Sequence, residues 1–285
     1  MTHDRDPSET HDRDPSETHD RDPSETHDRD PSETHDRDPS ETRDRGPSAY
    51  IAEFIGTFVL VFFVTAAYSL YLAPAPGFTD FGVIGLVHVF VLFVLIQTLS
   101  LASGAHFNPA VTLALTAMRQ IKPADAGIYI VTQLAGAVAG GLVTKLLLED
   151  EGSRVNYGAV TVNPERFESI ILPGMVAEFI GTFILVIVIV GVAVNPRAAT
   201  DWAALSIGAA LGLGVMVIAP LTGAGFNPAR AFGPALVAGE FGGAGNFLLI
   251  YVIAPILGAL AAAFGYFRLY ITPGSKGEAG LGPVG

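Results

Sequence analysis

The sequence predicts an all-α membrane protein with six transmembrane helices and two re-entrant half-helices, related as an inverted repeat. Three observations predict this fold. Residues 81–118, 202–229 and 241–267 contain no charged residue, whereas a spanning helix needs about 20 predominantly apolar residues. A seven-residue segment recurs unchanged, and an Asn-Pro-Ala turn occurs twice. The body of the chain is therefore a duplicated membrane domain, although its overall 50% hydrophobic and 15% charged residues resemble a soluble protein.

The N-terminal part has a different composition. Residues 2–41 are five tandem copies of Thr-His-Asp-Arg-Asp-Pro-Ser-Glu, with three acidic residues and one Arg in each, so they hold most of the formal net charge of −12. The copies contain no aliphatic or aromatic residue to bury, and their prolines block a continuous helix. We expect a disordered arm over residues 1–47 and a flexible C-terminal tail over residues 272–285. Weak metal binding by the arm is the alternative to a solvated tail, through His3, His11, His19, His27 and His35.

No apolar run precedes Tyr50, so we expect no signal peptide. The chain has no Cys, which excludes disulfides, metal-thiolate sites and thiol catalysis.

Six spans follow from the apolar stretches and the Pro- and Gly-containing turns that flank them. Their expected ranges are 50–72, 81–102, 124–147, 173–194, 203–221 and 246–270. Two further apolar pieces, 108–118 and 227–238, are too short to cross a bilayer. We expect these to enter and leave on the same side as re-entrant half-helices.

The orientation follows from the basic residues. They precede span 1 and follow spans 2, 4 and 6, at Arg43, Arg45, Arg119, Lys122, Arg197 and Arg268. The connection after span 1 has no Lys or Arg, and the connection after span 3 has two that are accompanied by five acids. Because Lys and Arg collect in cytoplasmic loops, we expect both termini in the cytoplasm.

The internal duplication decides the architecture. The segment from Ala52 to Phe58 is repeated letter for letter from Ala177, and Gly104–Ala110 recurs with one change as Gly223–Ala229. Three spans precede the second copy, so it enters the membrane from the opposite face. A channel domain over residues 48–271 therefore divides into inverted halves, about 48–148 and 173–271, with its functional site expected near the midplane.

The two turns are Asn108-Pro109-Ala110 and Asn227-Pro228-Ala229. Pro suits the first helical position because its missing N–H would have no helical partner, and Asn before it can cap the helix. With opposed insertion, the two helix N-termini meet, each carrying roughly +0.5 of an elementary charge. A dehydrated cation would be repelled there and a neutral molecule would not. A surface turn is the alternative reading of Asn-Pro, which two copies inside apolar segments disfavour.

Three polar residues within the apolar segments are expected to support the loops. Glu53 and Glu178 occupy matched positions in spans 1 and 4, where an intramembrane carboxylate is costly and is often a functional group. We instead expect each to accept hydrogen bonds from unpaired backbone N–H groups of a re-entrant loop, with His106 bracing the first loop.

Arg230 follows the second Asn-Pro-Ala turn, whereas the first copy has Val111 there. A cation at a constriction donates to the permeant and repels protons and other cations. Glycines spaced four apart on spans 3 and 5 are expected to allow close helix approach, namely Gly136, Gly140, Gly208 and Gly212.

These motifs resemble those of the aquaporin, or major intrinsic protein, family. The duplicated Ala-Glu-Phe-Ile-Gly-Thr-Phe segment and the runs around the two Asn-Pro-Ala turns carry the resemblance, which covers residues 50–270 and not the octapeptide arm. The resemblance implies an aquaporin-like channel that assembles as a homotetramer in the lipid bilayer. It also implies one pore per subunit, no cofactor and no energy coupling.

The resemblance further implies an aromatic/arginine filter of four residues. Counted from the two turns, these positions are His88, Val215, Ala224 and Arg230. Strict water channels resemble Phe, His, a small residue and Arg, and glycerol facilitators resemble Trp, Gly, Phe and Arg. The combination in this chain matches neither, and is closest to plant vacuolar-membrane members that pass ammonia as well as water.

We therefore expect a passive channel of the plasma membrane for water, with ammonia or another small neutral solute possible and glycerol slow. The alternatives are a glycerol or other small-solute facilitator, and a structural tetrameric membrane protein with a closed pore. An enzyme is not expected, because no nucleophile lies with a base and no metal-ligand spacing occurs. Nor do we expect a cofactor, a metal site or a nucleic-acid partner.

Overall fold

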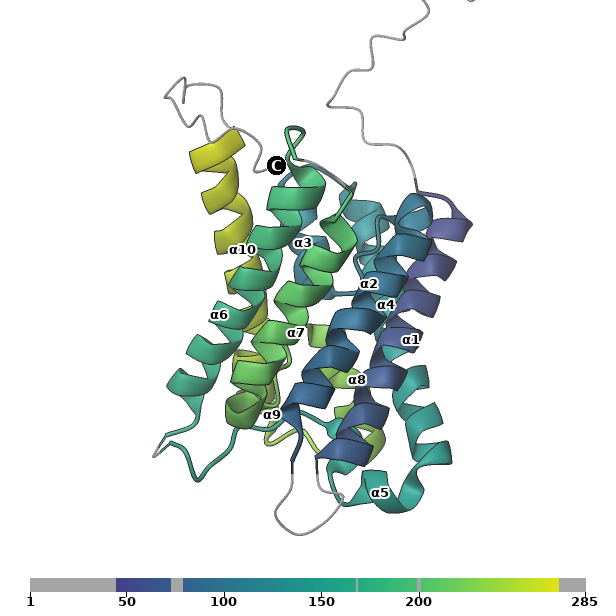
Figure 1. Ribbon diagram of the computed structural model, residues 1–285, viewed down its shortest axis with the longest axis vertical. Helices are drawn as coiled ribbons and strands as arrows, with labels where there is room; N and C mark the ends of the chain where they lie inside the picture. Colours follow the sequence, from purple (N-terminus) through teal and green to yellow (C-terminus); the bar gives the residue numbers. More distant parts are fainter. Residues whose placement is uncertain (1–44, 73–78, 168, 199–200, 272–285) are drawn as a thin grey trace, which may run out of the picture. The chain divides into compact units, whose positions relative to one another are not determined.

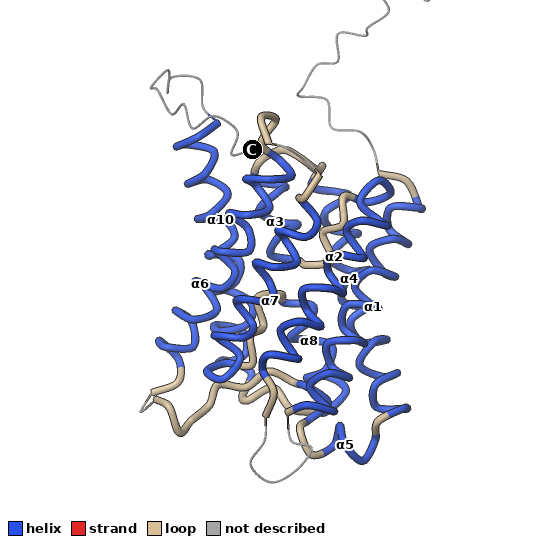
Figure 2. The backbone as a smooth tube through the Cα atoms, in the orientation of Figure 1, coloured by secondary structure: helices blue, strands red, loops and turns tan. Residues whose placement is uncertain are grey.

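The computed structural model describes residues 45–72, 79–167, 169–198 and 201–271. Within these ranges all regular structure is helical and no strand occurs (Figure 2). The predicted tail at residues 272–285 lies outside the described residues. Of the predicted arm, only Arg45, Gly46 and Pro47 lie within them, and Pro47 is the first residue of the first helix.

Six helical segments are long and apolar enough to cross a membrane, as predicted. The first three are α1 (Pro47–Tyr71), α2 (Phe81–Ser103) and α4 (Pro123–Leu147). The fourth is α6 (Ile171–Ile189), extended by the π-helical turn η3 (Val190–Val194), and the fifth is α7 (Ala203–Thr222). The sixth runs without a break through α9 (Ala244–Phe247), η4 (Leu248–Ile253), α10 (Ala254–Tyr266) and η5 (Phe267–Ile271).

The two predicted half-helices are present. They are α3 (Pro109–Ala117), with nine residues, and α8 (Pro228–Ala238), with eleven. Figure 1 places α3 in the upper half of the helical bundle and α8 in the lower half. Two short elements were not predicted: α5 (Glu149–Ser153) and the 3₁₀ turn η2 (Asn156–Gly158), both in the connection between α4 and α6.

The packing of the helices follows the inverted repeat. Helix α1 packs on α4, as α6 packs on α10, and the two second spans, α2 and α7, pack on each other. Each half-helix crosses to the other half, so that α3 packs on α10 and α8 packs on α4. Neither half can therefore complete its packing without the other, and the two half-helices contact each other between them.

The glycines on the third and fifth spans allow close approach of the backbones, which confirms that prediction. A Cβ at Gly136 or Gly140 would collide with backbone atoms of α1, and one at Gly208 or Gly212 would collide with backbone atoms of α2. Gly258 meets the backbone of α6 in the same way, in the inverted copy of the α1–α4 contact. The hydrophobic effect does not drive helices together inside a bilayer. Small residues at such crossings instead allow the close van der Waals packing that stabilises the contact.

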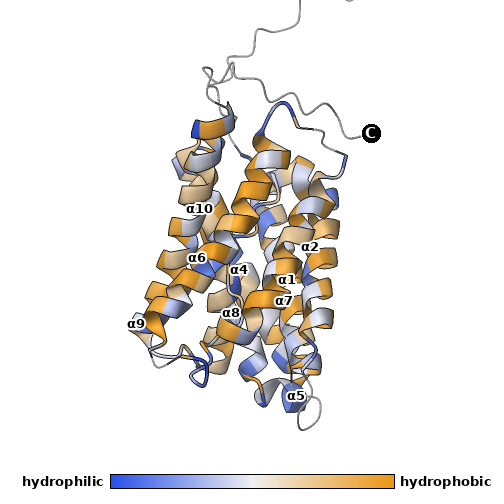
Figure 3. Ribbon diagram, turned by 60° about the vertical axis from the view of Figure 1, so that its left-hand side comes forward, coloured by the Kyte–Doolittle hydropathy of each residue, from blue (hydrophilic) through white to orange (hydrophobic). Residues whose placement is uncertain are grey.

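Hydrophobic residues predominate along the spans, and hydrophilic residues gather at the loops (Figure 3). Many large apolar side chains point outward, among them Phe90, Val131 and Val217. The start of α1 and the end of α10 lie on the same side, at the top of Figure 1. An even number of spans produces that arrangement.

The α1–α4 contact leads to a stability prediction. We expect Gly136→Ala to lower the free energy of unfolding by about 1–3 kcal/mol, because its Cβ overlaps the α1 backbone. The matched control is Gly127→Ala on the same helix, where an added Cβ meets nothing within 4 Å. There the better helix propensity of Ala should stabilise the protein by up to about 1 kcal/mol.

Thermal unfolding of the two purified variants in detergent checks this difference. A Gly136→Ala protein as stable as Gly127→Ala would contradict it.

Candidate functional site

The two Asn-Pro-Ala turns cap the two half-helices. The Oδ1 atom of Asn108 accepts a hydrogen bond of 2.9 Å from the Ala110 N–H at the start of α3. The Oδ1 atom of Asn227 accepts from the N–H groups of Ala229 and Arg230, at 3.0 and 3.2 Å. In each case Pro occupies the first helical turn, so the side-chain oxygen satisfies N–H groups that lack a helical partner.

The same two side chains join the halves to each other. The Nδ2 atom of Asn108 donates to the carbonyl oxygen of Phe226 at 2.9 Å, and Nδ2 of Asn227 donates to that of Phe107 at 2.8 Å. The half-helices therefore meet at their N-termini. Each amide has two N–H groups, so one remains for a molecule in the cavity that both Asn residues line.

The loops that reach these turns have an unusual backbone. Ala105 and Phe107 adopt φ values of 54° and 47°, and the matching Ala224 and Phe226 adopt 49° and 52°. The left-handed region is costly for residues with a side chain and persists only where the surroundings enforce it. These loops therefore need strong anchoring.

Glu53 supplies the anchor of the first loop. Its carboxylate is fully buried and accepts hydrogen bonds from the N–H groups of His106 and Phe107 at 3.0 and 2.7 Å. It also accepts from Ser103 Oγ at 2.6 Å and from Gln133 Nε2 on α4 at 2.8 Å. Gln133 was not predicted as a site residue, because a single Gln within a span has no distinguishing pattern.

Glu178 does the same in the second half. It is also fully buried, and it accepts from the N–H groups of Gly225 and Phe226 at 2.9 and 2.7 Å and from Thr222 Oγ1 at 2.6 Å. A carboxylate that accepts several N–H and O–H bonds is compensated for its burial. Both carboxylates therefore serve the loop backbones, and neither lines the cavity.

The glycine inside each duplicated segment makes room for a loop side chain. A Cβ at Gly56 would overlap the ring of Phe107, and one at Gly181 would overlap the ring of Phe226. The segment that carries the loop-binding Glu thus also holds the pocket for the loop Phe, three residues further along the helix. This accounts for the Glu and the Gly that the two copies share.

Two tyrosines extend the symmetry and were missed. Tyr129 OH donates to the carbonyl of Ser103 at the end of α2, and Tyr251 OH donates to that of Thr222 at the end of α7, both at 2.7 Å. The sequence does carry a signal for this equivalence: each tyrosine follows an Ile and stands seven residues before a Gly-Ala pair, at Gly136 and at Gly258.

His106 lies beside the first loop. Its Nδ1 atom is 3.1 Å from Thr112 Oγ1 on α3, and its ring meets the ring of Tyr129 edge-on at 5.1 Å. It therefore joins the loop to the half-helix that follows, and it also lines the cavity.

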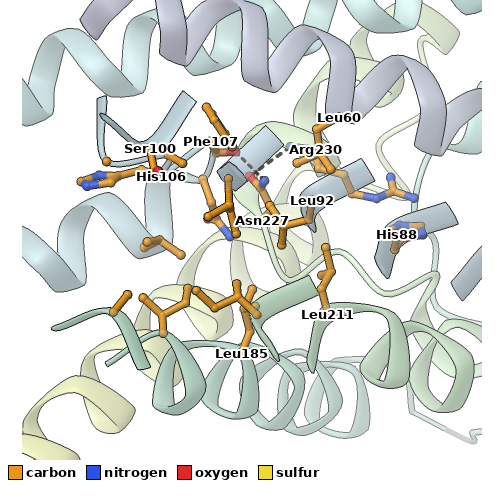
Figure 4. Close-up of a pocket in the computed structure, with 18 of the residues that line it drawn as sticks. Leu60, His88, Leu92, Ser100, His106, Phe107, Leu185, Leu211, Asn227 and Arg230 are labelled. Carbon is orange, nitrogen blue, oxygen red and sulfur yellow. Dashed lines mark hydrogen bonds between the residues drawn. The ribbon is translucent and has the colours of Figure 1, made fainter. Parts of the chain in front are cut away.

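A cavity of about 110 Å³ runs along the contact between the halves. In Figure 4, Asn227 lies between His106 at one end and His88 with Arg230 at the other. The remaining wall is largely aliphatic, with Leu60, Val64, Leu92, Ile96, Leu185, Ile189, Ile207 and Leu211. Polar groups are therefore confined to the loops and the two ends.

Arg230 and His88 form the polar end. Nη1 of Arg230 donates to the carbonyl oxygen of Gly158 at 3.0 Å, whereas Nε and Nη2 are buried without a partner among the described residues. Nδ1 of His88 is 2.8 Å from the carbonyl oxygen of Ile84. A carbonyl can only accept, so Nδ1 carries the proton, and Nε2 of the neutral ring is an unpaired acceptor.

Of the four expected filter residues, His88 and Arg230 line this cavity. Val215 and Ala224 are 0% and 1% exposed and belong to the same apolar cluster as the cavity-lining Leu60, Leu92 and Leu211, but they do not themselves line this cavity. Within the described residues, no cluster of three or more His, Asp or Glu side chains could hold a metal ion.

Comparison with known proteins places these features in a family. Residues 43–266 match the family described as major intrinsic protein. The chain is 38% identical over 239 residues to aquaporin AqpM from Methanothermobacter marburgensis, covering 76% of this chain and 94% of that protein. It is 38% identical over 217 residues to glycerol uptake facilitator protein-like 6 from Lactiplantibacillus plantarum, covering 75% and 94%.

Among solved structures, the fold is similar to that of the aquaglyceroporin from Plasmodium falciparum, with a TM-score of 0.68. The match covers 79% of this chain and 97% of that one, at 23% identity. At this identity the likeness concerns the fold alone.

The anchoring role of Glu178 can be tested by Glu178→Gln. Gln offers a single acceptor oxygen where the carboxylate has two, so at least one loop N–H loses its partner. We expect the free energy of unfolding to fall by about 1–3 kcal/mol, measured by thermal unfolding in detergent. Glu149→Gln on the exposed turn α5 is the matched control. Indistinguishable stability of the two variants would contradict the anchoring role.

Proposed function

The chain belongs to the major intrinsic protein family and is a passive membrane channel, and we propose that water is its main permeant. The observation that carries this proposal is the end of the cavity. There Arg230 presents two unpaired donor atoms and His88 presents one unpaired acceptor, all buried. Water donates and accepts at once, so a single molecule can satisfy both sides.

The middle of the cavity supports the exclusion of ions. The N-termini of α3 and α8 meet there, each with a partial positive charge. The aliphatic walls offer no oxygen ligands that could replace the hydration shell of a cation. A cation would therefore lose its water and meet two positive helix ends, whereas a neutral molecule loses little. Arg230 adds a full positive charge at the end of the cavity that it shares with His88, in the manner attributed to aquaporin-type pores.

Ammonia is the further permeant that we propose. Like water, ammonia both donates and accepts hydrogen bonds, and His88 Nε2 can accept a hydrogen bond from one of its N–H groups. We expect glycerol to pass slowly, because the buried His88 and Arg230 side chains share one end of the cavity. A glycerol facilitator is the second candidate, since one relative at 38% identity is named a glycerol uptake facilitator protein-like.

We propose that the filter also includes Val215 and Ala224, whose small side chains would leave its remaining sides without polar groups. The apolar grooves on the outer faces of α1–α2 and α6–α7 support a homotetramer. The distribution of basic residues supports cytoplasmic termini, and the plasma membrane is the location that we propose. In this proposal residues 48–271 form the channel domain, and the regions on either side form an arm and a tail.

A permeability panel in proteoliposomes tests the proposed function. Water efflux should be far faster than in protein-free vesicles, ammonia entry should exceed the lipid background, and glycerol and urea should remain near that background. Glycerol swelling that approaches the water rate would favour the facilitator. Normal incorporation with water permeability no higher than in protein-free vesicles would indicate a closed structural protein.

The role of His88 is tested by His88→Phe, which retains a ring and removes the acceptor nitrogen. Ammonia has one lone pair for the Arg230 donors where water has two, so it depends more on donating to His88. We therefore expect ammonia conductance to fall up to about fivefold more than water conductance, the equivalent of one hydrogen bond of about 1 kcal/mol. Phe90→Leu, on the exposed face of the same helix, is the control. Equal loss of both conductances in stopped-flow measurements would argue against His88 as a selectivity element.

A further inference from the structure

Tyr68, on α1, lies behind the polar end of the cavity. It is 3% exposed, and its hydroxyl donates to the carbonyl oxygen of Gly223 at 2.7 Å. Gly223 opens the loop that leads to the second Asn-Pro-Ala turn. The hydroxyl therefore ties the side chain to the loop that carries Arg230, and the position of the ring is fixed.

The ring of Tyr68 faces both polar residues of the filter. The guanidinium carbon of Arg230 lies 5.0 Å from the ring centroid, and the ring of His88 meets it edge-on at 6.2 Å. A guanidinium over an aromatic face is attracted by the ring quadrupole, most strongly where water is excluded. Tyr68 therefore contacts the donor and the acceptor side of the constriction at the same time.

The base of the Tyr68 side chain also supports the hydrogen-bond partner of Arg230. A Cβ built at Gly158 would lie 3.0 Å from the Tyr68 Cβ, and Gly158 has a φ of 72°, which favours Gly. The turn η2 thus packs directly on Tyr68 and presents its Gly158 carbonyl to Nη1 of Arg230. Tyr68 therefore contacts the Arg230 guanidinium through its ring and also packs against Gly158, whose carbonyl accepts from that guanidinium.

Arg230 needs such support. Nη1 is the only guanidinium nitrogen with a hydrogen-bond partner in the described part of the chain. An arginine has a long side chain with several rotatable bonds, and its ordering is costly in entropy. Without the ring beneath it, a single hydrogen bond would fix the guanidinium, and its remaining donors would no longer be held toward the cavity.

We propose that Tyr68 is a positioning residue of the filter, which holds the Arg230 guanidinium and the His88 ring so that they narrow the passage and favour water over larger neutral solutes. The inference rests on the proposed water-channel function and deepens it, because it adds a residue of the first span to the four filter positions. It concerns the ratio of permeabilities rather than permeation itself.

The test compares Tyr68→Leu with the wild type in proteoliposomes. Leu fills most of the apolar volume and removes the ring, so we expect the ratio of glycerol to water permeability to rise at least about fivefold, the effect of losing a desolvated cation–π contact. The matched control is Phe63→Leu, an aromatic residue on the same helix that is 50% exposed. A ratio unchanged from the wild type in Tyr68→Leu would overturn the inference.

Two further variants separate positioning from general structure. Tyr68→Phe keeps the ring and removes only the hydrogen bond to Gly223, so its ratio should stay within about twofold of the wild type. In an Arg230→Val background, Tyr68→Leu should change the ratio clearly less than in the wild type, because only its contact with His88 remains. The assignment to the ring would be overturned if Tyr68→Leu changed the permeability ratio as much in the Arg230→Val background as in the wild type. Equal changes of the ratio in Tyr68→Phe and Tyr68→Leu would also overturn it.

Should Tyr68→Leu fail to assemble, Tyr68→Met fills the same space with a flexible side chain and carries the same expectation. Failure of the proposed function would appear separately. In that case the wild type itself would not raise water permeability, whereas failure of the inference leaves the wild-type water permeability high and the ratio unmoved.

Discussion

The fold depends on one reciprocal interaction, the pair of hydrogen bonds from Asn108 Nδ2 to the Phe226 carbonyl and from Asn227 Nδ2 to the Phe107 carbonyl. It joins two helix N-termini inside an apolar bundle, an arrangement that their partial positive charges oppose. The cross-packing of α3 on α10 and α8 on α4 supports it from outside. The electrostatic barrier that we propose for the channel is thus the same structure that holds its halves together.

This meeting point is costly, and much of the interior offsets the cost. Each loop contains residues in the left-handed region and N–H groups without secondary-structure partners, and an unsatisfied buried N–H costs about 1–3 kcal/mol. Glu53 and Glu178 satisfy those groups, and Gly56 and Gly181 accommodate the loop phenylalanines. The carboxylates are therefore placed behind the loops, where they balance the donors without offering a cation ligand to the cavity.

The sequence was sufficient for features that have a local or repeated pattern. Hydropathy located every span to within three residues, and the duplicated segment identified the two half-helices and the inverted halves. Contacts between distant segments left no such signal: Tyr68 reads as an ordinary apolar-face residue, Gln133 as a chance polar residue, and η2 as loop. Counting positions from the turns located His88 and Arg230 at the cavity, whereas the filter roles of Val215 and Ala224 stay predictions.

The central claim is that the paired half-helix N-termini admit water and reject protons. Water permeability and proton flux measured in the same proteoliposomes, at increasing amounts of protein, test it most directly. The account predicts that water permeability rises in proportion to the protein while proton flux remains at the level of protein-free vesicles. Proton flux that rises together with water permeability would contradict it.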